Sequence, residues 1–486
     1  MTTFQIFLLI NYVLCFLIVL QMIFFSKKKP ERIVAWTLFL VFPFVGLFFY
    51  CLVGGGLNRM SKTMIKRKQL SSAEYNRHIK KQIEEIEKNK ETNDYPEEVR
   101  DLILLNLNNS DSIYTQNNSI EYFCDGGSVF DKMMEDIKNA QSTIHIEFYI
   151  FANDKTGKKM KNLLIEKAKQ GVEIRLLYDS IGSLRTRKRM FRKLKKAGGM
   201  IAEFFPPFMN IKFLNVNANY RNHRKVVVID GKIGYAGGIN IRDDHMGLSK
   251  KLSPWRDTHV RIVGGAVSSL QNIFLSDWRY SIADKNKVDY YLNEKYFPVA
   301  PKDSGNIGMQ VLSSGPENSN EAIKECIIKM IVSAKKRIRI QTPYFIPDDT
   351  FIGSIKLAVL SGVEVEIIVP KKIDHWHVHY ASLSYLNDML SLGVKIYEYQ
   401  GFIHSKAVLV DDEILTLGSC NIDIRSFSLN FEDNVVIYDK DKVVEYSKIY
   451  DKDLENCVRY TEQSRKKKNI FVKIMISLCR LFSAIL

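Results

Sequence analysis

The sequence predicts an α/β protein of two tandem halves, each a mixed sheet covered by helices, preceded by a transmembrane helical hairpin. Three observations predict this fold. Apolar β-type runs alternate with amphipathic helical stretches, one strand–helix–strand pattern occurs twice, and two long apolar runs lie near the N-terminus. With 486 residues, of which 46% are hydrophobic, the chain can form two cores plus appendages and is not a disordered protein.

The predicted hairpin occupies residues 1–58. Apolar runs cover 4–25 and 33–53, and each reaches the roughly 20 residues that cross hydrocarbon as a helix. A cleaved signal peptide is the alternative, but the start Met1-Thr2-Thr3 has no basic residue and no A-x-A-like site precedes the lysines of the connecting loop. We therefore expect a multi-pass protein of the cell membrane with two spans.

The side of the membrane on which the remaining chain lies is less strongly indicated. Basic residues lie on both sides of the second apolar run, so the positive-inside rule gives almost no preference between the two membrane orientations. Seven cysteines are scattered without C-x-x-C spacing, which favours a reduced domain facing the cytoplasm.

An internal repeat defines the two halves. Residues 140–151 align with 334–345 as alternating strands, and Gly171–Leu177 corresponds to Gly362–Ile368, a buried strand entered after a helix-ending glycine. These matches place the halves at 110–290 and 305–465. A connector helix is expected at 59–109, with isoleucines at helical spacing, and an amphipathic helix at 466–486. Because duplicated halves commonly pack about a pseudo-twofold axis, a shared site would take matching residues from both.

Each half carries the same polar motif after its second repeated strand. The two copies read His223-Arg-Lys225-Val-Val-Val-Ile-Asp230 with Gly237-Gly238-Ile-Asn240, and His404-Ser-Lys406-Ala-Val-Leu-Val-Asp411 with Gly418-Ser419-Cys-Asn421. Strand alternation places each histidine and lysine on one face. Attack on a phosphodiester needs a nucleophile, cations for the phosphate oxygens and an acid for the leaving group. One H-x-K is a common accident, but identical spacing in two repeats predicts a shared catalytic site.

Further residues are expected to support this site. Gly238, Asn240, Ser419 and Asn421 would bind phosphate oxygens through backbone and side-chain donors. Asp230 and Asp411 end buried strands, and we assign these two motif residues a structural, charge-pairing role. Downstream acids, Asp257 and Glu432, would each orient the histidine of its own half and fix its tautomer.

The two motifs resemble the HKD signatures of the phospholipase D superfamily over residues 110–465. The resemblance implies a covalent phosphohistidine on one histidine, with the other acting as acid and then base, and neither metal nor cofactor. Only His375-Trp-His377-Val-His379 has metal-like spacing. No cysteine or carboxylate cluster completes it, so a helix or loop face near the cleft is favoured there.

Within that superfamily, the apolar hairpin, the connector, Asn222–Lys225 and Gly401–Lys406 are most similar to bacterial cardiolipin synthases. This similarity implies phosphatidyl transfer between two phosphatidylglycerol molecules, giving cardiolipin and glycerol. His223 would attack phosphorus and His404 would protonate glycerol, although pseudosymmetry allows the reverse. The alternatives are a membrane-bound phospholipase D that hydrolyses phospholipids, a phospholipase D-type nuclease and a purely structural membrane protein.

Charge and apolar segments favour a lipid partner. The formal net charge is +16, residues 185–196 contain eight cations, and an apolar loop follows at 204–209. The alternative for the basic segment is a solvated helix, and the alternative for the apolar loop is a contact with the core. Within 470–486, polar residues recur at helical spacing, which fits an interfacial or a buried terminal helix. We expect an anionic phospholipid membrane as partner, phosphatidylglycerol as substrate and no nucleic acid, and the sequence leaves the oligomeric state open.

Overall fold

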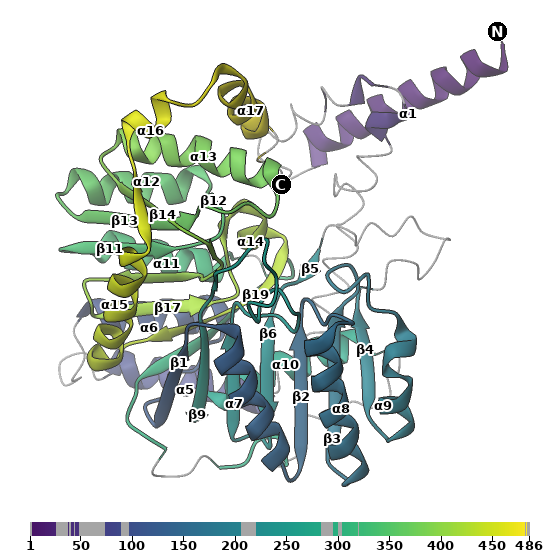
Figure 1. The fold of residues 1–486 in the computed structure, drawn as a ribbon, viewed down its shortest axis with the longest axis vertical. Helices are drawn as coiled ribbons and strands as arrows, with labels where there is room; N and C mark the ends of the chain where they lie inside the picture. The colour runs from purple at the N-terminus through teal and green to yellow at the C-terminus, as the bar shows by residue number, and fades with distance from the viewer. Residues whose placement is uncertain are drawn as a thin grey trace.

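The computed structural model describes residues 2–25, 37, 40–42, 44–47, 73–88, 97–205, 220–282, 295–299, 304–318, 320–481 and 483. Two α/β halves lie side by side, and helix α1 (Thr3–Phe25) projects from the upper side in Figure 1. Over Thr3–Ile23, α1 is long and apolar enough to cross a membrane. The predicted second span at 33–53 lies largely outside the described residues, so the two-span hairpin stays a prediction.

The connector contains two helices where one was expected. They are α5 (Ala73–Lys88) and α6 (Glu97–Ser110). One helix through position 96 is disfavoured because Pro96 has no backbone N–H to donate. Ile79 is buried and its helical neighbours Ile83 and Ile86 pack against the core of the second half, which fixes the connector to that half.

The first half is a seven-stranded mixed sheet in the order β1-β9-β7-β6-β2-β3-β4. Strands β2, β3 and β4 run parallel and the other neighbours run antiparallel. Its elements are β1 (Asn118–Phe123), α7 (Gly126–Asn139), β2 (Thr143–Phe148), α8 (Lys155–Lys169), β3 (Glu173–Asp179), a 3-10 turn (Lys188–Phe191), α9 (Arg192–Lys196), β4 (Met200–Phe204), β5 (Arg221–Asn222), β6 (Lys225–Ile229), β7 (Ile233–Gly237), β8 (Trp255–Arg256), β9 (His259–Gly264) and α10 (Val267–Ser281).

The second half repeats this order as β10-β19-β17-β16-β11-β13-β14 and adds β20 at one edge. Gly171 and Gly362 precede β3 and β13 with φ of 90° and 86°, as the predicted helix-ending glycines require. The elements are β10 (Met309–Ser314), α11 (Ala322–Ser333), β11 (Arg337–Gln341), β12 (Phe345–Ile346), α12 (Asp349–Leu360), β13 (Glu364–Pro370), α13 (Trp376–Ser391), β14 (Lys395–Tyr399), β15 (Phe402–Ile403), β16 (Ala407–Val410), β17 (Ile414–Gly418), β18 (Ile422–Asp423), α14 (Ile424–Ser428), β19 (Asn430–Ile437), α15 (Lys440–Glu455), β20 (Cys457–Tyr460), α16 (Glu462–Lys466) and α17 (Ile470–Leu481).

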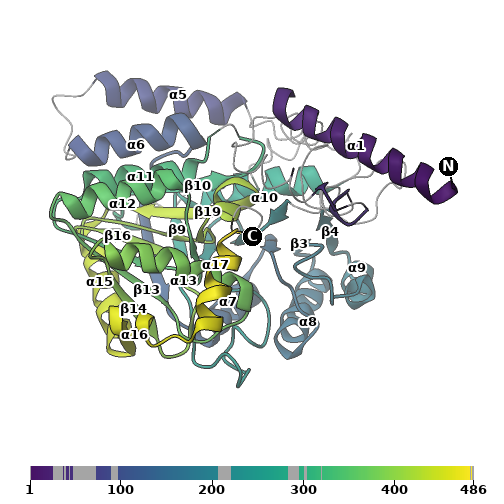
Figure 2. The same ribbon diagram turned by 90° about the horizontal axis from the view of Figure 1, so that it is seen from above.

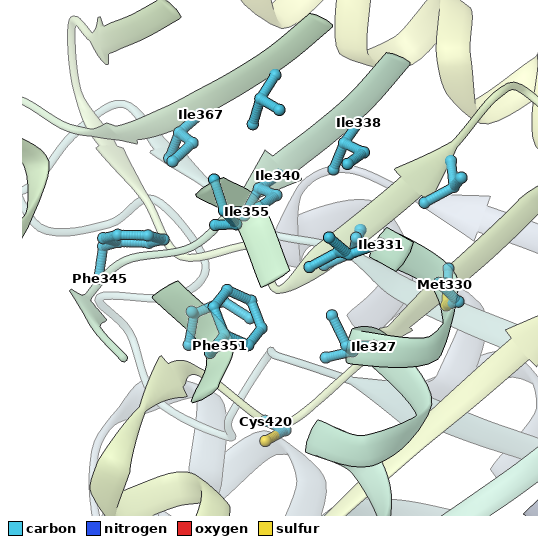
Figure 3. Close-up of a cluster of buried hydrophobic side chains, with 14 of the residues drawn as sticks. Ile327, Met330, Ile331, Ile338, Ile340, Phe345, Phe351, Ile355, Ile367 and Cys420 are labelled. Carbon is cyan, nitrogen blue, oxygen red and sulfur yellow. The ribbon is translucent and has the colours of Figure 1, made fainter. Parts of the chain in front are cut away.

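A shared core joins the halves. Val228 and Leu270 from the first half belong to the same buried cluster as Leu415 and Tyr446 from the second. Each half also has its own outer core beneath its covering helices. In the second half, side chains of α11, β11, α12 and β13 meet, and Cys420 lies at the lower edge of this cluster (Figure 3). Because Cys420 follows Ser419 in the motif, the core holds that turn in place.

The basic run at 185–196 is a solvated surface. Phe191 and Leu194 of this run are buried, whereas all eight cations are exposed. In the apolar loop predicted at 204–209, Phe204 and Phe205 are core residues, and 206–209 lie outside the described residues. Neither segment, as far as it is described, presents an apolar membrane-facing surface.

Candidate active site

Short strands cross between the halves where the two motifs meet. β5 of the first half pairs with the start of β19, and β15 of the second half pairs with β8. The His223 N–H donates to the Phe431 carbonyl (2.9 Å), and the His404 N–H donates to the Arg256 carbonyl (2.6 Å). The backbone of each motif histidine is therefore held by the opposite half.

The orienting acids are exchanged between the halves. His223 Nδ1 lies 2.9 Å from Glu432 Oε2, and His404 Nδ1 lies 2.7 Å from Asp257 Oδ2. The prediction that each acid serves its own half was wrong, because the crossing strands bring each acid to the other half's histidine. Both acids are fully buried. A carboxylate accepts the Nδ1 proton, so Nε2 of each ring carries the lone pair available for chemistry.

The two motif lysines place positive charge inside the site. Lys225 and Lys406 are buried, and each ammonium donates to the backbone carbonyl of its own motif histidine. Burial lowers the pKa of Lys225 to about 8 and that of Lys406 to about 7. Their mutual repulsion further lowers the Lys406 pKa. A bound phosphate would favour both charged forms.

Burial also keeps both histidines neutral near pH 7. It lowers the pKa of His223 to about 4, although the Glu432 carboxylate acts in the opposite direction. The pKa of His404 is lowered by burial and then by the charges of Lys406 and Lys225. Burial raises the pKa of Glu432, but the contacts with His223, Lys225 and Ser419 together outweigh this effect, and the pKa is lowered overall. A neutral imidazole beside an ionised carboxylate is the form that attacks phosphorus.

Two of the predicted phosphate ligands, Gly238 and Ser419, lie against the orienting acids, and their binding of phosphate stays a prediction. A Cβ at position 238 would lie 2.1 Å from Asp257 Oδ1, so glycine is required for that carboxylate to approach. The Ser419 hydroxyl donates to Glu432 Oε2 (2.6 Å) and accepts from the Asp433 N–H (2.9 Å). The equivalent turns of the two halves therefore position the two acids.

The two predicted asparagines also have partners within the protein. The Asn240 side-chain oxygen Oδ1 accepts from the Ile150 N–H (3.0 Å), and the Asn421 side chain is hydrogen-bonded to Asp423. These contacts tie each motif turn to a neighbouring segment. Phosphate binding by these asparagines stays a prediction.

The motif aspartates lie at the far ends of their strands, away from the histidines. Asp230 accepts from the N–H groups of residues 141, 142 and 143, and Asp411 accepts from those of 335, 336 and 337. Both have positive φ, at 53° and 56°. Three backbone hydrogen bonds in each half therefore support the predicted structural role, and the charge pairing expected for it stays a prediction.

Aromatic and imidazole rings around the histidines were missed in the sequence. The Tyr149 ring meets His223 edge-on at 4.9 Å, and its centroid lies 5.7 Å from the Lys225 ammonium. His245 and Trp255 have ring centroids 5.2 Å from that of His404. The available signals were positional, since Tyr149 follows the repeated strand β2 and His245 follows the Gly237-Gly238 turn.

One metal-like cluster occurs among the described residues, and it differs from the one considered in the sequence. Ligand atoms of His245, Asp257 and His404 all lie within 4.8 Å of one another. His375 caps α13, and His377 and His379 lie in its first turns, so this run is the start of a helix. The cluster of His245, Asp257 and His404 contains the contact that orients His404. The 2.7 Å separation of His404 Nδ1 and Asp257 Oδ2 indicates a hydrogen bond.

Two imidazole–carboxylate pairs and two buried ammonium groups, at the junction of duplicated α/β halves, define a phospholipase D-type phosphodiester-transferring site. The family model described as "Cardiolipin synthase, PLD-like domain" matches residues 133–278 and 327–454. The chain belongs to this family of phospholipase D-like cardiolipin synthases, which confirms the resemblance seen in the sequence.

Similar proteins extend over nearly the whole chain. A cardiolipin synthase of Oceanobacillus iheyensis is 40% identical over 482 residues, covering 98% of each chain. The major cardiolipin synthase ClsA of Bacillus subtilis is 39% identical over 483 residues, again covering 98% of each. A phosphatidylserine synthase structure from Haemophilus influenzae superposes with a TM-score of 0.62 at 16% identity, over 80% of this chain and all of that one. This last likeness shows the two-half fold.

Proposed function

We propose that this chain is a phosphatidyltransferase that joins two phosphatidylglycerol molecules into cardiolipin and releases glycerol. The observation that carries the proposal is the exchanged pair of histidine–carboxylate contacts, His223 with Glu432 and His404 with Asp257. These contacts supply two imidazoles of matched orientation in one buried site. One can attack while the other handles protons, as a two-step transfer requires.

In the first step, His223 Nε2 attacks the phosphorus of one phosphatidylglycerol. A P–N bond forms, the P–O bond to the headgroup glycerol breaks, and His404 donates its proton to the departing oxygen. Lys225 and Lys406 offset the charge on the phosphate oxygens. The negative charge of the substrate phosphate supports this step. Burial alone lowers the pKa of His404 and disfavours its protonated form, whereas a nearby negative charge favours that form.

In the second step, a terminal hydroxyl of the second phosphatidylglycerol gives its proton to His404 and attacks the phosphohistidine. The new P–O bond forms as the P–N bond breaks, which restores neutral His223. Water can make the same attack, so transfer depends on excluding it. The low exposure of the site supports exclusion, since the side chains of His223 and His404 are only 12% and 10% exposed.

We further propose an anionic membrane as the working environment, with two N-terminal spans and the catalytic halves on the cytoplasmic side. The apolar helix α1 supports the first span, and the second apolar run at 33–53 supports the other. The net charge of +16 suits a surface rich in phosphatidylglycerol.

The test is a reconstituted assay of the full chain in phosphatidylglycerol vesicles, with lipid products followed by mass spectrometry. His404→Ala is the inactive variant. His375→Ala is the matched control, because His375 is 63% exposed and lies outside the site. We expect cardiolipin and glycerol to appear in equal amounts with the wild type and the control, and to disappear with His404→Ala.

The other outcomes identify the alternatives. Phosphatidic acid without cardiolipin would make the chain a hydrolase of the same site. The chain would be a nuclease if no lipid product formed and if it cleaved single-stranded nucleic acid, with a rate that falls steeply as the salt concentration rises.

A further inference from the structure

The C-terminal helix α17 has an apolar face that the fold leaves uncovered. Its inner side is firmly attached, because Ile476 and Cys479 are buried and Arg480 donates to Asp388 (2.7 Å) on α13. Its outer side is a continuous apolar stripe of Ile470, Phe471, Ile474, Leu478 and Leu481, which are 45% to 75% exposed. A contiguous exposed apolar surface of this kind marks a site of interaction with a partner.

The start of α13 extends this apolar surface. Trp376 is 57% exposed and Ile373 is 37% exposed, and both lie at the start of α13, the helix on which α17 packs. Helix α17 packs on α13, where Arg480 also donates to the Ser384 hydroxyl (3.0 Å). The stripe on α17, together with Ile373 and Trp376, is called the C-terminal apolar face below.

Cations surround the C-terminal apolar face. Lys466, Lys467 and Lys473 are exposed beside it. A second copy of the chain would bring the same lysines against each other, whereas an anionic bilayer offers apolar tails beneath a negative surface. In Figures 1 and 2, α17 lies across α13 on the same side of the molecule as α1, the helix long enough to span a membrane.

We propose that the C-terminal apolar face docks on the anionic bilayer in which α1 is anchored, with Trp376 and the α17 stripe inserted at the level of the headgroups. Docking holds the catalytic halves at a fixed orientation relative to the membrane plane. It also brings to the membrane surface a small hollow that is lined by Tyr344, Ile373 and Phe402 among others. The Phe402 ring stacks 6.0 Å from the ring of His404, so this hollow adjoins the catalytic histidine.

The test uses the fluorescence of Trp376 in the full chain reconstituted in phosphatidylglycerol vesicles. The chain has four tryptophans, so the emission of Trp376 is taken as the difference between the wild type and Trp376→Phe. With lipids brominated near the headgroup end of the acyl chains, this difference should fall by roughly half, because an inserted ring lies at that depth. Lack of quenching in vesicles that hold the protein would overturn the proposal.

Paired surface variants provide the control. Phe471→Asp with Leu478→Asp should abolish the quenching while α1 keeps the protein in the vesicles. Leu357→Asp with Leu360→Asp on α12 places charges at residues that are 62% and 72% exposed and should leave the quenching unchanged. Protection of Trp376 from aqueous iodide without quenching by brominated lipid would mean that a protein covers this face, and would also overturn the proposal. Because the readout is binding depth, it is independent of whether the lipid product is cardiolipin or phosphatidic acid.

Discussion

Replacing Glu432 by glutamine tests the exchange of acids between the halves. The substitution keeps the shape and a hydrogen-bond acceptor but removes the negative charge that lies 2.9 Å from His223 Nδ1. That charge stabilises the positive charge that develops on the ring as His223 attacks phosphorus. Since Glu432 is fully buried, solvent cannot replace it.

The expected magnitude follows from Coulomb's law. Unit charges roughly 4 Å apart at an effective dielectric constant of about 20 interact by about 4 kcal/mol. Loss of that stabilisation in the transition state corresponds to a rate decrease of roughly 1,000-fold. Asp257→Asn should cause a similar loss through His404, because its contact of 2.7 Å is equivalent.

The assay is the initial rate of cardiolipin formation in phosphatidylglycerol vesicles, with the melting temperature measured in parallel. Glu366→Gln is the matched control, since Glu366 is another buried glutamate of the second half and its partner is Arg339. We expect this control to stay within a few-fold of the wild type. A near wild-type rate for Glu432→Gln would refute the assignment of Glu432 to His223. An equal loss of rate in Glu366→Gln would also refute it.

Three further predictions concern the motif turns and the lysines. Gly238→Ala should lower turnover by at least roughly tenfold by displacing Asp257, with the melting temperature as a check on folding; equal loss in Gly353→Ala, whose Cβ would meet nothing within 4 Å, would contradict this reason. Asp411→Ala should lower the free energy of unfolding by about 2–4 kcal/mol in denaturant titrations, because three backbone N–H groups lose their acceptor; lost activity at unchanged stability would argue for a catalytic role. The pKa of Lys406 is lowered to about 7, so its ammonium is present below that pH and lost above it, and kcat/KM should decline as pH rises through 7. Lys406→Arg should move that decline to higher pH, and an unmoved profile would assign it to another group.

The features that repeat along the chain could be predicted from the sequence. The two repeated strands of each half and the glycine before the second of them lie at the expected residues. The two histidines do not lie within a strand as expected: His223 lies between β5 and β6, and His404 lies between β15 and β16. The family of phospholipase D-like cardiolipin synthases follows from the same motifs. The identical spacing of the motif in the two repeats was enough to identify His223, Lys225, His404 and Lys406 as the candidate site.

The contacts between the halves could not be predicted in this way. Glu432 follows its own motif along the chain, and only the pairing of β5 with β19 reveals that it serves His223. The contacts of Gly238 and Ser419 with the buried acids were not predicted, because a tight turn near an anion and a tight turn near a buried acid have the same sequence. In the connector, the isoleucine spacing indicates a helix but does not show where the helix ends, and Pro96, which disfavours a continuous helix, lies between α5 and α6.

The exchanged acids also determine when the enzyme becomes reactive during its synthesis. Ribosomes make the chain from the N-terminus, so His223 emerges 209 residues before the carboxylate that orients it, and Asp257 emerges 147 residues before His404. A nascent or truncated chain with a folded first half holds neither pair. Membrane lipids near the translating ribosome are therefore exposed to a working site only after the last central strand, β19, has taken its place between the halves.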